Sequence, residues 1–239
     1  MQSKYAVIER SATQFLENGT ICTPFSLVEE VINKLPISWN DPSLRFLDPA
    51  CGRGSFLFVI KLRLLEAGHS EQHIVENMLF AADIASKNVA VTRAILNPNK
   101  YKDNIECCDT LKKDWGKMKF DVVVGNPPYS EGGDAKLYRE FGLLAMEIAD
   151  VVAFITPGTF KRQQKFEKLR QQMDRRGVYT IQSLPIDTFG ANVRVDDPSY
   201  WIVGCGTKTV ADFVVDEHDK LIARLALAPE QKRTWVGGQ

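Results

Sequence analysis

The residues with the clearest chemical potential form one short run, Asn126-Pro127-Pro128-Tyr129, directly after an apolar segment. The Asn126 side-chain oxygen and the Pro127 carbonyl are hydrogen-bond acceptors, and the two prolines stiffen the backbone that carries them. Tyr129 adds a flat face on which a planar group can lie. The run therefore predicts a pocket for a planar amine, whose two N–H bonds meet two acceptors that also stabilise positive charge developing on nitrogen. The structural alternative is a simple turn after a buried strand.

A second segment has the form of a nucleotide-binding turn between a strand and a helix. Mostly apolar residues 44–47 lead into Asp48, and residues 48–56 read Asp-Pro-Ala-Cys-Gly-Arg-Gly-Ser-Phe before a helical pattern that extends to Glu66. The glycines allow a ligand to approach the backbone closely. The full three-glycine dinucleotide pattern is missing, and a carboxylate at Asp48 suits a cationic ligand. This combination favours the amino acid portion of S-adenosylmethionine over NAD.

Two more aspartates follow apolar segments further along the chain. Asp83 comes after residues 78–82, and Asp109 comes after residues 104–108. At the ends of parallel strands, Asp83 is placed to accept hydrogen bonds from ribose hydroxyls, and Asp109 from the exocyclic amine of an adenine. A helix cap or a turn is the alternative role for each of them.

Taken with Thr23-Pro24, these motifs give the chain a resemblance to a known family. It resembles the S-adenosylmethionine-dependent DNA adenine-N6 methyltransferases of the gamma arrangement, which carry a Thr-Pro motif, the Asp-Pro-Ala-Cys-Gly loop and the Asn-Pro-Pro-Tyr loop in this order. The order here is the same, over roughly residues 20 to 205. The resemblance implies methyl transfer from S-adenosylmethionine to the N6 atom of an extruded adenine in DNA, by direct in-line displacement.

The resemblance also assigns roles to individual positions. It implies that Asn126, Pro127, Pro128 and Tyr129 are catalytic and that Tyr129 also contacts the target base. Phe189 stands where relatives place an aromatic ring against the flipped base, although a core position is the alternative. Arg53 departs from the small residue of many relatives and receives no role. The implied cofactor-binding residues are Thr23 and Pro24 at the methionine carboxylate, Asp48 and Gly52 at the methionine end, Asp83 at the ribose, Asp109 at the adenine, and Ala50, Ile84 and Asn126 without a more specific role.

The elements that must position these residues alternate between strand and helix patterns. This alternation, with the resemblance, predicts an α/β fold with a doubly wound, mostly parallel sheet of the class I methyltransferase, Rossmann-like type. The predicted division is an N-terminal helical segment over 1–43, a catalytic core over 44–210 and a short tail over 211–239. After the Asn-Pro-Pro-Tyr run, helices are expected over 137–149 and 160–176, and strands over 151–157, 179–184 and 200–205.

DNA contact must come from local features, since Lys plus Arg and Asp plus Glu number 30 each. The best candidate is the basic stretch 161–176, with Lys161 and Arg162 facing phosphates, although a solvated helix face is the alternative. Arg194 lies in a second, smaller cationic loop. Residues 131–134, with two glycines, are expected to form a lid over the extruded base.

The remaining features limit the location and the partners of the protein. Five cysteines without a Cys-x-x-Cys pair indicate reduced thiols, and no signal or membrane-length segment is visible, so a cytoplasmic protein is expected. His69 and His73 are interpreted as surface residues, and no metal is expected. The 34 residues after Cys205 are too few for a target-recognition domain. Target reading is therefore expected from loops, a separate specificity subunit or a missing recognition domain, and the existence of a restriction partner stays open.

Two other functions remain compatible with the motifs. The same Asn-Pro-Pro-Tyr chemistry also serves RNA or protein-glutamine amino methyltransferases, although these usually lack the Thr-Pro motif. A non-catalytic, methyltransferase-like subunit is the second alternative, and the intact Asp48, Asn126 and Tyr129 argue against it.

Overall fold

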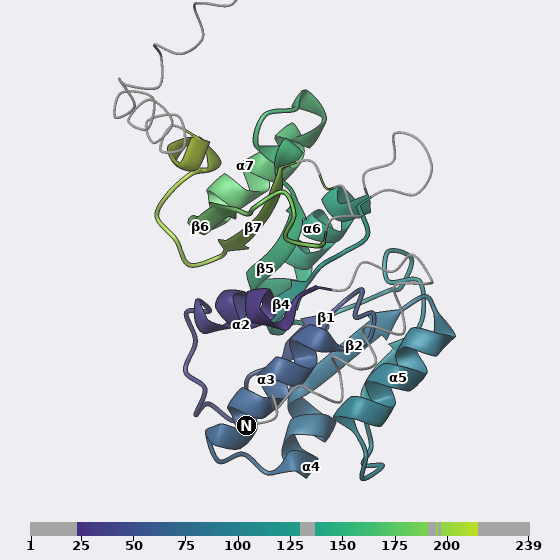
Figure 1. Ribbon diagram of the computed structural model, residues 1–239. Helices are drawn as coiled ribbons and strands as arrows, with labels where there is room; N and C mark the ends of the chain where they lie inside the picture. The colour runs from purple at the N-terminus through teal and green to yellow at the C-terminus, as the bar shows by residue number, and fades with distance from the viewer. Residues whose placement is uncertain (1–22, 130–136, 191–194, 196, 215–239) are drawn as a thin grey trace, which may run out of the picture.

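The computed structural model describes residues 23–129, 137–190, 195 and 197–214. Its centre is a seven-stranded sheet in the order β3-β2-β1-β4-β5-β7-β6 (Figure 1). Neighbouring strands from β3 to β5 are parallel, and β7 is antiparallel to both β5 and β6. The predicted mostly parallel sheet is therefore confirmed. The strands are β1 (Phe46–Asp48), β2 (Leu79–Asp83), β3 (Asn104–Cys107), β4 (Phe120–Gly125), β5 (Ala149–Pro157), β6 (Val178–Ser183) and β7 (Pro198–Val203).

Helices cover both faces of this sheet, because the central strands are apolar on both sides. Along β4, Val122 and Val124 enter one hydrophobic core and Val123 enters the other, as the period of two requires. The first core contains apolar residues of α2, α3 and α5, and the second contains those of α6 and α7. The helical segments are α2 (Phe25–Asn33), α3 (Ser55–Glu66), α4 (Glu71–His73), η2 (Ile74–Met78), α5 (Ser86–Leu96), α6 (Leu137–Ile148), η3 (Gly158–Lys161), η4 (Gln164–Phe166) and α7 (Glu167–Arg176).

The prediction of a single helix over 160–176 is wrong for its first half. Two short 3₁₀ turns, η3 and η4, precede α7, which begins only at Glu167. The Arg170 guanidinium donates hydrogen bonds of 2.7 Å to the carbonyls of both Phe160 and Gln163. These contacts bind the irregular stretch before α7 to the second turn of that helix.

The chain before β1 is attached to the rest of the fold at several points. Helix α2 packs in the same core as α3, and both histidines of the α4 region bond to the connection that follows α2. The Nε2 atom of His69 donates to the Trp39 carbonyl at 2.8 Å, and that of His73 donates to the Pro42 carbonyl at 2.8 Å. The predicted division at 43/44 and 210/211 stays a prediction. None of the described helices is both long and apolar enough to cross a bilayer.

Candidate active site

The carboxyl ends of β1, β2 and β4 bring the sequence motifs to one edge of the sheet. Asp48 ends β1, Asp83 ends β2 and Asn126 follows β4. Strand β1 lies between β2 and β4 and pairs in parallel with both. The chain moves outward from β1 to β3 and returns at β4, so this edge is the topological switch point where open α/β sheets bind ligands.

The loop after β1 is fixed by hydrogen bonds from the elements next to it. Gly52 has φ +51°, and a Cβ added there would have no heavy atom within 4 Å. Its N–H donates to Asp83 Oδ2 at 2.8 Å, and its carbonyl accepts from the Thr92 hydroxyl at 3.0 Å. The loop therefore presents a left-handed, uncovered glycine backbone, which a ligand can approach closely.

Asp48 is the most strongly perturbed carboxyl group at this edge. It is 2% exposed, and burial raises its pKa to about 8, with the neighbouring Asp83 carboxylate adding to the increase. The Ala50 N–H donates to Asp48 Oδ1 at 3.2 Å and opposes that increase. On the other side, Gly125 has φ +151°, and a Cβ there would lie 2.7 Å from the same oxygen. A cationic group of a ligand placed beside this buried carboxyl would stabilise its ionised form.

Asp83 fixes the same loop from β2. Its Oδ1 atom accepts from the Ala85 N–H at 2.8 Å and from Asn88 Nδ2 at 3.1 Å, while Oδ2 accepts from Gly52. Oδ2 thus retains acceptor capacity for a further donor. The next residue, Ile84, is 74% exposed and offers an apolar surface beside the carboxylate.

Asp109 lies in a turn, which is one of the alternative roles predicted for it from the sequence. Its carboxylate accepts from the Leu111 N–H at 3.2 Å and pairs with Lys112 at 2.8 Å, and the Lys112 contact lowers the pKa of Asp109. The adjacent Thr110 hydroxyl donates to the Pro49 carbonyl at 2.5 Å. This bond ties the Asp109 turn to the loop after Asp48, and nothing in the local sequence pattern indicates it. Whether Asp109 contacts an adenine stays a prediction.

In the Asn-Pro-Pro-Tyr run, two buried polar atoms make no hydrogen bond to the described residues. Asn126 Nδ2 donates to Thr23 Oγ1 at 3.1 Å, whereas Asn126 Oδ1 is buried without a hydrogen-bond partner. The Tyr129 hydroxyl is likewise buried and meets no partner with hydrogen-bond geometry. Burial raises the pKa of Tyr129, and a side-chain interaction with the adjacent Asn126 amide, which falls short of that geometry, opposes the increase. Pro127 is buried and Pro128 is exposed. A buried acceptor without a donor is rare in a folded protein and points to a missing partner.

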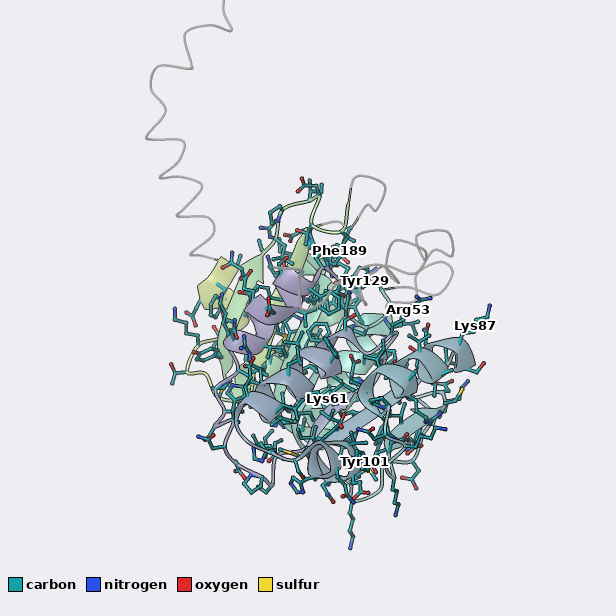
Figure 2. The ribbon with its side chains drawn as sticks, turned by 60° about the horizontal axis from the view of Figure 1, so that its bottom comes forward. Arg53, Lys61, Lys87, Tyr101, Tyr129 and Phe189 are labelled. Carbon is teal, nitrogen blue, oxygen red and sulfur yellow. The ribbon has the colours of Figure 1, made fainter. Side chains whose placement is uncertain are left out.

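An aromatic stack fixes the ring of Tyr129. It meets the Tyr138 ring edge-on, with centroids 6.3 Å apart, and Tyr138 stacks on Phe166 at 5.0 Å. Phe189 is 7% exposed and belongs to the core cluster against which Tyr129 also packs. Figure 2 shows Tyr129 and Phe189 towards the same end of the molecule, away from Lys61 and Tyr101. Phe189 thus has the burial of a core residue, and its contact with a base stays a prediction.

The structure contradicts the expected solvent-facing position of Lys161. Its side chain is 1% exposed, and Nζ bonds Ser183 Oγ at 2.7 Å and lies 3.6 Å from Asp197 Oδ1. This ammonium, in the 3₁₀ turn η3, lies by the end of β5, beside the last residue of β6 and the residue before β7, and is buried from solvent. Arg162 is exposed and remains a candidate contact. Arg194 and the 131–134 lid lie outside the described residues.

The sequence comparisons agree with these motifs. The family profile for "N-6 DNA Methylase" matches residues 5–189, more than half of the 239 residues.

The chain belongs to the N-6 DNA methylase family.

Two curated proteins are similar to this chain. The chain is 27% identical over 191 residues to the type II restriction enzyme and methyltransferase RM.BcgI of Heyndrickxia coagulans, covering 72% of this chain and 29% of that protein. It is 24% identical over 224 residues to the modification methylase CviBIII of Paramecium bursaria Chlorella virus NC1A, covering 84% of this chain and 54% of that protein. The chain thus spans about half or less of the length of these relatives.

Solved structures support the fold of this N-6 DNA methylase family member. A modification subunit assigned to a type I restriction enzyme from Vibrio vulnificus YJ016 superposes with a TM-score of 0.67 at 19% identity, over 84% of this chain and 48% of that one. The fold is that of the class I S-adenosylmethionine-dependent methyltransferases. Among the described residues, no group of three His, Cys, Asp or Glu side chains gathers as a metal site.

Proposed function

We propose that this chain transfers a methyl group from S-adenosylmethionine to the N6 atom of an adenine extruded from DNA. The observation that carries the proposal is the buried, unpaired Asn126 Oδ1 atom, which follows β4 at the switch point of the sheet. Its partner in the reaction is one N–H of the target amine. Family membership and the names of the relatives support DNA as the substrate.

The residues at the carboxyl edge fit S-adenosylmethionine. The buried Asp48 carboxyl suits the cationic methionine end, and the uncovered Gly52 backbone permits close approach. Asp83 Oδ2 keeps an acceptor lone pair, and exposed Ile84 offers an apolar face beside it. When bound, the cofactor supplies an electrophilic methyl group on a sulfonium. Thr23, Pro24 and Asp109 complete the proposed set.

The target amine is activated by acceptors and not by a general base. Asn126 Oδ1 and the Pro127 carbonyl accept its two N–H bonds, which favours a tetrahedral nitrogen with its lone pair free to attack. As positive charge develops on that nitrogen, the two dipoles stabilise it without reorganising. The Tyr129 ring, held by Tyr138, provides the face for the base, and Phe189 is the proposed second aromatic contact.

Asn126→Ala tests this assignment directly. Removing an acceptor aimed at developing charge should lower the methyl-transfer rate on DNA by about 10²–10³-fold or more. Cofactor affinity by calorimetry should stay within about threefold, because Asp48, Gly52 and Asp83 are retained. Asn77→Ala is a matched control, since Asn77 is exposed in η2, at the opposite end of β2. Near-normal transfer by Asn126→Ala would show that the assignment is wrong.

The substrate class is tested by incubating the protein and methyl-labelled cofactor with separate DNA, RNA and protein pools. The proposal expects N6-methyladenine in DNA. Label in RNA or in glutamine would favour the rival methyltransferases. No cofactor binding at millimolar concentration would favour a non-catalytic subunit. A separate specificity subunit or a recognition domain is the proposed partner for target reading, since a similar structure is a modification subunit of a restriction enzyme. The cytoplasmic location also stays a prediction.

A further inference from the structure

We infer that Thr23 is a positioning residue for the reaction, because its hydroxyl holds the Asn126 amide with Oδ1 directed to the target amine. The inference rests on the proposed function and deepens it. The observation is the 3.1 Å hydrogen bond from Asn126 Nδ2 to Thr23 Oγ1, which joins residues 103 positions apart.

The amide of Asn126 needs a specific orientation to work. With Nδ2 bonded to Thr23, the acceptor Oδ1 is the atom left unpaired and buried. The reversed amide would present two donors to an amine that is itself a donor, and the two groups would repel each other. In the structure the Thr23 hydroxyl accepts from the Nδ2 end, which leaves the oxygen end available. The same bond also polarises the amide and strengthens Oδ1 as an acceptor.

Thr23 itself is held by a rigidly packed helix. Pro24, the next residue, accepts backbone hydrogen bonds from Leu27 and Val28 at 3.0 and 3.1 Å, which sets the start of α2. Val28 is fully buried in the first core. At the other end of α2, the Tyr200 hydroxyl of β7 donates to Glu30 at 2.7 Å. The helix therefore places the Thr23 hydroxyl with little freedom, as a positioning group requires.

The alternatives for Thr23 are a packing residue and a cofactor contact alone. Packing needs the shape of the side chain, and valine reproduces that shape without the hydroxyl. A cofactor contact would change cofactor affinity more than the chemical step. Positioning of Asn126 needs the hydroxyl and acts on the chemical step. Serine at position 23 should therefore preserve the transfer rate, and valine should not.

The test compares Thr23→Val and Thr23→Ser in single-turnover methyl transfer, with DNA and cofactor both saturating. The inference expects Thr23→Val to slow transfer by about 10–100-fold, since a buried donor loses its partner and the amide its support. Thr23→Ser should stay within about threefold of the parent rate, and in Thr23→Val the loss in transfer rate should exceed any loss in calorimetric cofactor affinity, to which Thr23 also contributes as a proposed cofactor contact. A parent-like rate for Thr23→Val, equal losses in both variants, or a loss confined to cofactor affinity would each overturn the inference.

A second measurement does not depend on activity. The inference expects Thr23→Val to lower the melting temperature in the parent protein and to have a smaller effect in the Asn126→Ala background, because the bond is already gone. Equal shifts of the melting temperature in both backgrounds would show that Thr23 and Asn126 do not interact. If the parent methylates no pool, the proposed function fails, and this thermal cycle still decides whether Thr23 holds Asn126.

Discussion

Binding of S-adenosylmethionine should release a proton from Asp48. Burial raises the pKa of this carboxyl to about 8, so it is about 90% protonated at pH 7 in the cofactor-free protein. A cationic methionine end beside the carboxyl favours the ionised form and lowers the pKa by an opposite-charge interaction. If the bound pKa falls below about 5, Asp48 releases about 0.9 proton per cofactor at pH 7 and about 0.1 at pH 9.

The assay is calorimetric titration with S-adenosylmethionine in buffers of different ionisation enthalpy. The slope of the observed enthalpy against the buffer enthalpy gives the number of protons exchanged. Asp48→Asn is the control, because it keeps the side-chain size but cannot release that proton. The difference between the two proteins cancels the proton exchange of the ligand itself. Equal proton numbers for the two proteins at pH 7, with cofactor bound by both, would refute the reasoning.

The same pKa has a consequence for stability. The pKa of Asp48 is raised above its unfolded value of 3.8, so its contribution to the unfolding free energy is fully present below about pH 4 and is lost as the pH rises through about 8. Chemical denaturation at pH 5 and pH 8.5 should therefore show a smaller decline in Asp48→Asn than in the parent. An identical decline in both proteins would argue against a neutral, buried Asp48.

Two further substitutions test the walls of the site and the DNA contact. Gly125→Ala places a Cβ within 2.7 Å of Asp48 Oδ1 and should weaken cofactor binding and lower the unfolding free energy by about 1–3 kcal/mol, as measured by calorimetry and denaturation. Gly116→Ala, with φ +52° and its nearest atom 4.0 Å away, is the control that carries backbone strain alone, and an equal cofactor defect there would contradict the steric argument. Arg162→Ala should reduce the slope of log DNA affinity against log salt by about 1, whereas the buried Lys161 should leave that slope unchanged when replaced by methionine. Filter binding between low and moderate salt measures the slope for both variants. A change of slope in Lys161→Met alone would show that Lys161, and not Arg162, contacts the phosphates.

Several predictions succeeded because they depend on neighbouring residues. Proline dihedral limits and the apolar run before Asn126 are local properties, and they placed that residue at the end of β4. Apolar runs ending in Asp48 and Asp83 likewise predicted strand ends, and parallel strands collect such ends at one edge. The family motifs then connected that edge to S-adenosylmethionine chemistry. The roles of the individual site residues, Asp109, Phe189 and Arg162 among them, stay predictions.

Other features depend on contacts between distant parts of the chain. Lys161 lies in a 3₁₀ turn and bonds Ser183, 22 positions away, and helical periodicity carries no sign of either. The bond between Thr23 and Asn126, and the one between Tyr200 and Glu30 across 170 positions, form only when α2 packs on the folded sheet. The order of amino acids is sufficient to locate the chemical groups, because backbone preference and hydrophobic period are local. Which polar atoms are paired and which remain unpaired follows from the packing of helices on the sheet, because that packing sets the distance and burial of groups far apart in the chain.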